Sequence, residues 1–227
     1  MTTVNAEFGR VAMHAVRREL LHAQAEAAGL PLIEVSIPYP CSNADYESRM
    51  RGLIETLRAE RITHMAFGDL FLADIRAYRE KQLRGTGITP LFPLWNEPTA
   101  GLAREMIAGG LRAVLTCVDP KQLAPEFSGR FFDNALLDSL PDGVDPCGER
   151  GEFHSFAFAG PMFLQAIEVE TGETVTRDGF VFTDVLPRDP DRLPRTRPAR
   201  RASEAIVLEN LCALPHPGLH PGGEGVR

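Results

Sequence analysis

The chain has 227 residues, of which 44% are hydrophobic and 24% are charged, a composition typical of a globular protein with a sizeable core. Its 24 basic and 31 acidic residues give a formal net charge of −7, which argues against a nucleic-acid-binding surface. No apolar run reaches the roughly 18 residues that a membrane span needs, and no signal-peptide pattern is visible. We therefore expect a cytoplasmic protein without nucleic-acid or membrane partners.

Helix and strand patterns alternate over the first half of the chain. Residues 10–28 carry apolar side chains close to helical spacing, and Gly29 follows, so we expect a helix there. Ser42 or Asn43 is placed to cap a second helix. Four buried strands are expected, at residues 30–38, 62–69, 88–95 and 112–119. This alternation predicts an α/β fold with a Rossmann-like parallel sheet and helices on both faces.

The pattern changes after residue 150. Residues 152–163, 164–176 and 179–187 are rich in aromatic and β-branched side chains and are separated by turn residues. They predict a short antiparallel β segment added near the end of the domain. Residues 188–227 are rich in proline, arginine and glycine, which predicts a disordered tail. We therefore divide the chain into a domain at residues 1–187 and a tail at residues 188–227.

Ligands of parallel sheets bind at the carboxyl ends of the strands, which draws attention to Asp69. Its carboxylate could hold a ribose hydroxyl or a metal ion, or it could cap the helix that follows, and the sequence favours neither. Arg76 and Arg79 share one helical face and could contact phosphate, although a solvated face is the commoner explanation. No metal-ligand spacing of the HExxH kind occurs, so we expect no metal site.

The stretch Gly148-Glu149-Arg150-Gly151-Glu152 precedes the aromatic run that begins near His154 and Ser155. Two carboxylates three residues apart face one site only if the two glycines bend the backbone, and glycine permits such a bend. The alternative is a solvated turn before a strand, which these residues alone slightly favour.

Several ordered motifs together resemble the diphthine–ammonia ligase family, whose members are of the ATP-pyrophosphatase, or PP-loop, type. They include "FGDLFLADIRAYREKQL", "CVDPKQL" and above all "DGVDPCGERGEFHSFAFAGPMF", within a resemblance that runs from Thr2 to about Pro187. The resemblance implies an adenine nucleotide alpha hydrolase-like domain. It also implies an ATP-dependent, amide-forming ligase in which a carboxylate is adenylated and ammonia then displaces AMP.

The resemblance also implies roles for individual residues. The acceptor-side motif would supply the substrate-binding residues Gly148, Glu149, Gly151, Glu152, His154 and Ser155. Gly68 and Asp69 would lie at the nucleotide-facing end of a strand, and no catalytic residue is assigned. ATP and Mg²⁺ are the implied cofactors. The implied partners are ammonia and a carboxylate acceptor such as a protein-borne diphthine, and a homodimer is one assembly to test.

The chain departs from this family at its beginning. The family opens with a strand and a Ser-Gly-Gly-Lys-Asp-Ser loop that cradles the ATP pyrophosphate, whereas Met1 corresponds to a point inside the family's second strand. Our hypothesis is that the start codon is assigned too late, and we expect weak or no ATP binding by these 227 residues. Two alternatives stay open: a non-catalytic binding homologue, and a ligase of the same mechanism that acts on a different carboxylate.

Overall fold

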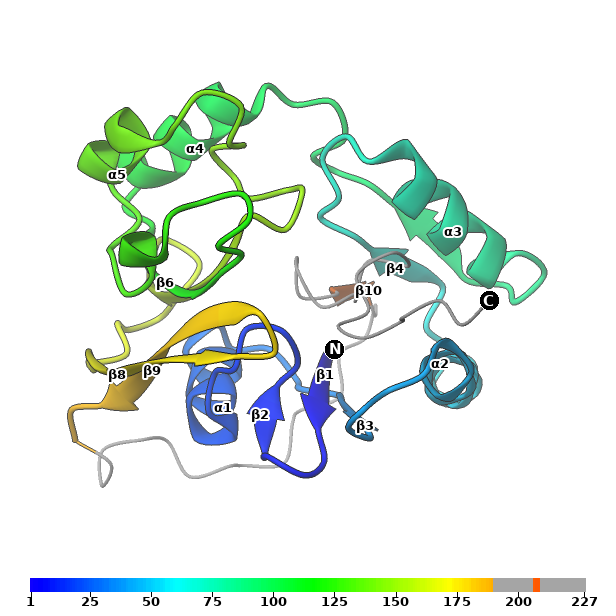
Figure 1. Ribbon diagram of the computed structural model, residues 1–227. Coiled ribbons are helices and arrows are strands. Elements are labelled where there is room, and N and C mark those ends of the chain that lie inside the picture. Colours follow the sequence, from blue (N-terminus) through cyan, green and yellow to red (C-terminus); the bar gives the residue numbers. More distant parts are fainter. Residues whose placement is uncertain (190–205, 209–227) are drawn as a thin grey trace, which may run out of the picture.

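Residues 1–189 and 206–208, which the computed structural model describes, form a mixed α/β fold with three β-sheets (Figure 1). The first sheet has the order β2-β1-β3, from Arg10–Val11, Thr2–Asn5 and Glu34–Ile37. The second has the order β10-β4-β5, from Ile206–Leu208, His64–Ala66 and Thr89–Leu91. The third has the order β7-β6-β9-β8, from Phe153–Ala159, Arg112–Val118, Phe180–Pro187 and Val169–Arg177.

Five α-helices and one short 3₁₀ helix connect these strands within the described residues. They are α1 (Arg18–Ala27), α2 (Asn43–Ala59), α3 (Ala73–Leu83), α4 (Thr99–Ala108), η1 (Pro125–Phe127) and α5 (Asn134–Ser139). The predicted cap of α2 is confirmed at Ser42, whose hydroxyl accepts from the Asp45 amide while the Asp45 side chain accepts from the Ser42 amide. This reciprocal pair satisfies two amides that the first turn of a helix leaves without intrahelical partners.

The first helix is shorter than predicted, because it begins at Arg18 instead of residue 10. The segment before it contains β2 and a turn in which Met13 and Ala15 adopt φ angles of 60° and 54°, which are incompatible with a right-handed helix. Arg10 and Arg17 bind Asp184 of β9 at 2.8 and 2.6 Å. These ion pairs come from a distant strand, so apolar spacing could not reveal them.

The predicted parallel sheet is present only as short pairs. β1 pairs in parallel with β3, and β4 pairs in parallel with β5. The fourth expected strand, β6, instead pairs antiparallel with β7 and β9. The antiparallel segment near the end of the domain is therefore confirmed, but it is built around β6. A run of buried apolar residues is compatible with either strand orientation, so the pattern could not decide between them.

Three clusters of buried apolar side chains stabilise the packing of the helices against the sheets. One lies between α2, β3 and β4 and contains Leu57 and Met65. Another packs α1 against β7 and β9 through Leu20, Phe156 and Val185. The third lies beside β6, α4 and α5. The last two clusters hold the antiparallel sheet, and with it the start of β7, in a fixed place.

Two further predictions concern membrane contact and the tail. Across the described part of the chain, no helix combines the length and apolarity needed to cross a membrane. Most of the tail at residues 188–227 lies outside the described residues. Within this range the structure describes Ile206–Leu208, which is the strand β10, and the predicted disorder of the tail stays a prediction.

Candidate functional site

The two segments that were predicted to form a site meet at the carboxyl end of β4. Gly68 and Asp69 follow this strand and begin the loop that leads to α3. The Glu149 carboxylate reaches the same loop, where its Oε1 atom accepts hydrogen bonds from the Leu70 amide at 2.8 Å and the Phe71 amide at 3.4 Å. The structure therefore joins the predicted nucleotide-side segment to the predicted acceptor-side segment through one carboxylate.

The loop that carries Glu149 is held by its own acidic side chains. The Asp145 Oδ1 atom accepts from the amides of Cys147 at 2.8 Å and Glu149 at 3.4 Å. The two carboxylate oxygens of Glu152 accept from the amides of Asp145 and Arg150, both at 2.9 Å. Only 2% of Glu152 is exposed, so this side chain closes the loop from inside. We call residues 145–152 the acidic loop.

The two glycines of the acidic loop produce the bend that the sequence allowed. Gly148 and Gly151 have φ angles of 70° and 80°, a region that residues with a Cβ atom rarely adopt. A Cβ atom at Gly148 would also lie 2.8 Å from the Phe153 carbonyl oxygen. The bend does not aim both carboxylates at one point, because Glu149 faces the loop after β4 and Glu152 faces inward.

Glu149 is half-buried, and its surroundings shift the pKa of its carboxyl group in both directions. Burial raises its pKa above the ordinary value, while the hydrogen bonds from Leu70 and Phe71 lower it. The nearby carboxylates of Asp69 and Asp145 raise it further. A raised pKa at a strand end is a property that functional acids often share, although structural networks produce it too.

Asp69 is buried and is not a helix cap. Its Oδ2 atom lies 2.6 Å from the Arg79 Nε atom, and both side chains are 8% exposed. Helix α3 is preceded by Leu72 and has no side-chain cap, so the capping interpretation of Asp69 is wrong. Arg79 also lies over the Phe67 ring, 4.5 Å from its centroid. The pair fixes the carboxyl end of β4 to α3.

The two arginines of α3 have different environments. Arg79 is buried in the pair with Asp69, so the solvated-face interpretation is wrong for this residue. Arg76 is more exposed, binds Glu80 at 2.9 Å and lies 4.6 and 4.7 Å from the ring centroids of Phe92 and Trp95. Each guanidinium already has a carboxylate and an aromatic neighbour within the fold.

His154 and Ser155 contact a different neighbour from Glu149. The ring of His154 lies 4.9 Å from the ring of His14, and the His14 Nδ1 atom lies 3.0 Å from the Ser155 carbonyl oxygen. Burial, together with the charge of His14, lowers the pKa of His154 to about 3. His154 is therefore neutral near pH 7 and joins β7 to the turn before α1.

Four residues of this region were not predicted to take part in it. The amides of Leu70 and Phe71 carry no side-chain signal, so no pattern could reveal them as the partners of Glu149. Asn96, with a φ angle of 65°, donates from its backbone to the Leu70 carbonyl at 2.7 Å. Asp145 could have been found, because aspartate before proline and glycine commonly accepts from nearby amides in turns. Among the described residues, no group of three or more His, Cys, Asp or Glu side chains is arranged to hold a metal ion.

Comparisons with known proteins match the most specific motif of the chain. Residues 98–185, which include the acidic loop, match the family model described as "Diphthamide synthase C-terminal domain". A protein named diphthine–ammonia ligase from Rattus norvegicus is 29% identical over 177 residues, which cover 71% of this chain and 66% of that protein. The protein of the same name from Danio rerio is 27% identical, and the match covers 71% of this chain and 69% of that protein. The one from Homo sapiens is 28% identical, and the match covers 71% of this chain and 66% of that protein.

The chain thus spans about two thirds of the length of these relatives. The resemblance that the motifs predict is confirmed by both the family model and the relatives.

Proposed function

This chain is a relative of the diphthine–ammonia ligase family, and from that premise we propose that it is an amide-forming ligase-type domain. Its substrates would be a carboxylate, which is diphthine or a related acid, and ammonia. A carboxylate is a poor electrophile, so ATP with Mg²⁺ would supply its activation by adenylation, with AMP as the group that ammonia displaces. Gly68 and Asp69 would then belong to the nucleotide side of the site, and the acidic loop to the acceptor side.

The observation that carries the proposal is the contact of Glu149 with the Leu70 and Phe71 amides. The Glu149 carboxylate is half-buried and accepts from two backbone amides of the loop after β4, so the acidic loop is not only a solvated turn. Ligands of α/β sheets bind at this edge. The contact therefore supports a common site for the two segments.

The described residues fit the acceptor side better than the nucleotide side. The 227 residues contain no Ser-Gly-Gly-Lys-Asp-Ser segment, and Asp69 is engaged by Arg79. We expect weak or no ATP binding by these 227 residues. Isothermal titration of this chain with ATP and Mg²⁺ tests that expectation, which a micromolar affinity would contradict.

The proposed roles within the acidic loop differ from one residue to the next. Gly151, which has open space beside it, would allow close approach of the acceptor to the backbone, and Gly148 would shape the bend of the loop against Phe153. Glu149, as the half-buried acid with a raised pKa, would contact the acceptor. Glu152 would shape the loop, since both its oxygens accept from amides of that loop. His154 and Ser155 would hold the start of β7 in position.

Release of AMP and pyrophosphate by the protein isolated from its natural source tests the ligase proposal. We expect release that depends on both ammonia and a carboxylate acceptor, with a loss in the Glu149→Gln variant. Release with a carboxylate other than diphthine would favour a ligase of the same mechanism with another acceptor. Acceptor binding without any release would favour a non-catalytic homologue and would contradict the ligase proposal.

A further inference from the structure

Arg150 lies where the acidic loop meets the loop after β4. Its backbone amide donates to the buried Glu152 carboxylate at 2.9 Å, whereas its guanidinium lies over the Phe71 ring, with 5.1 Å between the Cζ atom and the ring centroid. Phe71 is also one of the two residues whose amides bind Glu149. Arg150 therefore connects the same two loops as Glu149, and it does so with 51% of its side chain exposed.

One edge of the Arg150 guanidinium is available to a ligand. The Nη1 atom donates to the Gly143 carbonyl at 3.2 Å and lies 3.8 Å from the Glu152 Oε1 atom. The Nε and Nη2 atoms make no hydrogen bond to any residue that the structure describes. A planar guanidinium can donate two parallel hydrogen bonds to one carboxylate, and stacking on an aromatic ring holds its plane in place. Phe71 thus orients the guanidinium while its Nε–Nη2 edge stays accessible.

The charge of the acidic loop opposes the binding of an anion. Its residues 145–152 include three carboxylates, those of Asp145, Glu149 and Glu152, and one guanidinium, that of Arg150. Like charges a few ångströms apart repel each other, so these carboxylates would repel an acceptor that carries a carboxylate of its own. An anionic acceptor at this loop therefore requires a cation that it can contact directly.

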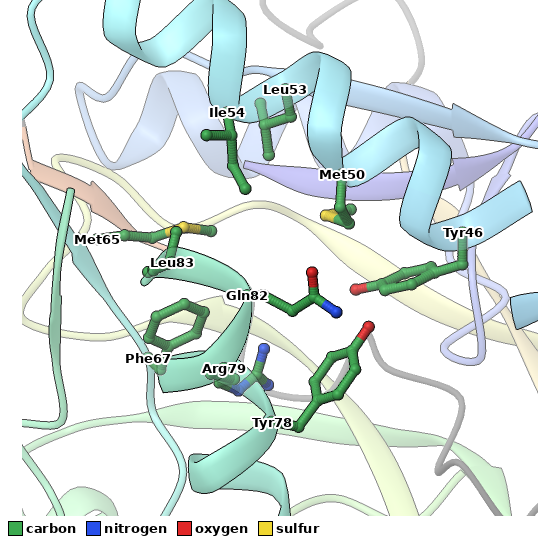
Figure 2. Close-up of a pocket in the computed structure, with 10 residues that line it drawn as sticks. All are labelled: Tyr46, Met50, Leu53, Ile54, Met65, Phe67, Tyr78, Arg79, Gln82 and Leu83. Carbon is green, nitrogen blue, oxygen red and sulfur yellow. The ribbon is translucent and has the colours of Figure 1, made fainter. Parts of the chain in front are cut away.

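The two arginines of α3 are less suited to this contact than Arg150. Figure 2 shows Arg79 among the side chains that line a cavity of about 40 Å³ between α2 and α3. Its guanidinium is 8% exposed and is paired with Asp69. Arg76 already uses its Nε atom to bind Glu80 at 2.9 Å. Arg150 has neither a close carboxylate partner nor a buried guanidinium, so it is the arginine that an acceptor at the acidic loop can reach.

We propose that Arg150 binds the carboxylate of the acceptor through its Nε–Nη2 edge and so selects the acid over the amide formed from it. This inference rests on the proposed function, because it assigns the acceptor side of that reaction to one side chain. A carboxylate accepts two charge-assisted hydrogen bonds from a guanidinium, whereas a carboxamide is neutral and has a single acceptor oxygen. The amide product therefore binds Arg150 more weakly than the acid does, which favours its release.

Titration of the full chain with butyrate and with butyramide tests this role without ATP or turnover. The two probes have the same carbon chain and differ in the charge of the group that would react. We expect butyrate to shift the NMR signals of the Arg150 Nε–H group and the Gly151 amide in a saturable way. It should bind about tenfold or more tightly than butyramide. Equal affinities for the two probes, or no saturable shift with butyrate, would overturn the role of Arg150.

Variants followed through the Gly151 amide signal separate Arg150 from other arginines. Arg150→Gln should weaken butyrate binding by about tenfold or more, whereas Arg150→Lys keeps the charge without the paired donors and should retain part of the affinity. Arg130→Gln is the matched control, because Arg130 also lies over a phenylalanine, 4.6 Å from the Phe127 centroid, and also donates to a backbone carbonyl. Its affinity for butyrate should equal that of the wild type. Equal losses in Arg130→Gln and Arg150→Gln would overturn the proposal.

The failure of this inference can be distinguished from the failure of the ligase proposal. Butyrate binding that depends on Arg150, in a protein that releases no AMP, would support the role of Arg150 and contradict the ligase proposal. Release of AMP by Arg150→Gln with an unchanged KM for the acceptor would support the ligase proposal and overturn the role of Arg150.

Discussion

The Oε1 atom of Glu149 lies 2.8 Å from the backbone nitrogen of Leu70, although 79 positions separate the two residues in the chain. This contact connects a loop before β7 with a loop after β4. It makes the acidic loop part of the same edge as Gly68 and Asp69. The consequences of this arrangement can be tested by substitution.

Replacing Glu149 should loosen both loops. In Glu149→Ala the Leu70 and Phe71 amides lose their carboxylate, and a buried donor without its partner costs about 1–3 kcal/mol of unfolding free energy. We expect faster hydrogen exchange at both amides and a denaturation midpoint shifted to lower denaturant. Glu170→Ala, at an exposed position of β8, is the control and should change stability by less than about 0.5 kcal/mol. Unchanged exchange at Leu70 would show that Glu149 does not hold this loop.

Alanine substitution should affect stability differently at Gly148, Gly151 and Gly52. Gly151→Ala places a Cβ in open space at a φ of 80°, so only backbone strain of about 1–3 kcal/mol is expected. Gly148→Ala should cost more, because its Cβ would also meet the Phe153 carbonyl. Gly52→Ala, inside α2 with open space around it, should raise stability by about 0.5–1 kcal/mol. Urea denaturation of the three variants gives the order, and equal losses at positions 148 and 151 would contradict it.

The buried pair of Asp69 and Arg79 should behave as a unit. Asp69→Asn or Arg79→Met alone leaves one charge buried without its partner, which costs about 3–5 kcal/mol. The double substitution should cost less than the sum of the two single ones, and a double-mutant cycle measures the difference. Arg76→Met disrupts the more exposed pair with Glu80 and should cost at most about 1 kcal/mol. Strict additivity at Asp69 and Arg79 would rule out their coupling.

The buried His154 predicts loss of stability in mild acid. Its pKa is about 3 in the folded protein, whereas the ordinary pKa of histidine is about 6.5. Between these values the unfolded chain binds a proton that the folded chain does not. The contribution of His154 to the free energy of unfolding is therefore fully present above about pH 6.5, and it is lost as the pH falls toward 3. At pH 5 the loss should be on the order of 2 kcal/mol.

Denaturation of the wild type and of His154→Asn at pH 7.5 and pH 5 isolates this contribution. The variant cannot take up the proton at this position, so its stability should fall less between the two pH values. Equal slopes in the two proteins would show that His154 does not cause the acid sensitivity.

The elements whose signals are local were predictable from the sequence. Ser42 or Asn43 was expected to cap the second helix, and Ser42 does so; the reciprocal part played by Asp45 was not predicted. Within residues 152–187, turn residues separate segments that favour strands. These segments were expected to pair antiparallel, which the structure confirms. The motif "DPCGERGEFHSF" identified the acidic loop as a candidate site before its position in space was known.

The partners of these elements were decided only by the tertiary structure. The sequence could not show that β6 runs antiparallel to β7, that Asp69 binds Arg79 in place of capping α3, or that Glu149 reaches the Leu70 amide. Helix caps and turns depend on hydrogen bonds between residues a few positions apart, so the local sequence is enough to predict them. Long-range pairs depend instead on which surfaces pack together and on backbone groups that every residue shares. Hence the sequence alone determined which segments form the candidate site, and packing determined that Glu149 faces β4 while Glu152 closes the loop.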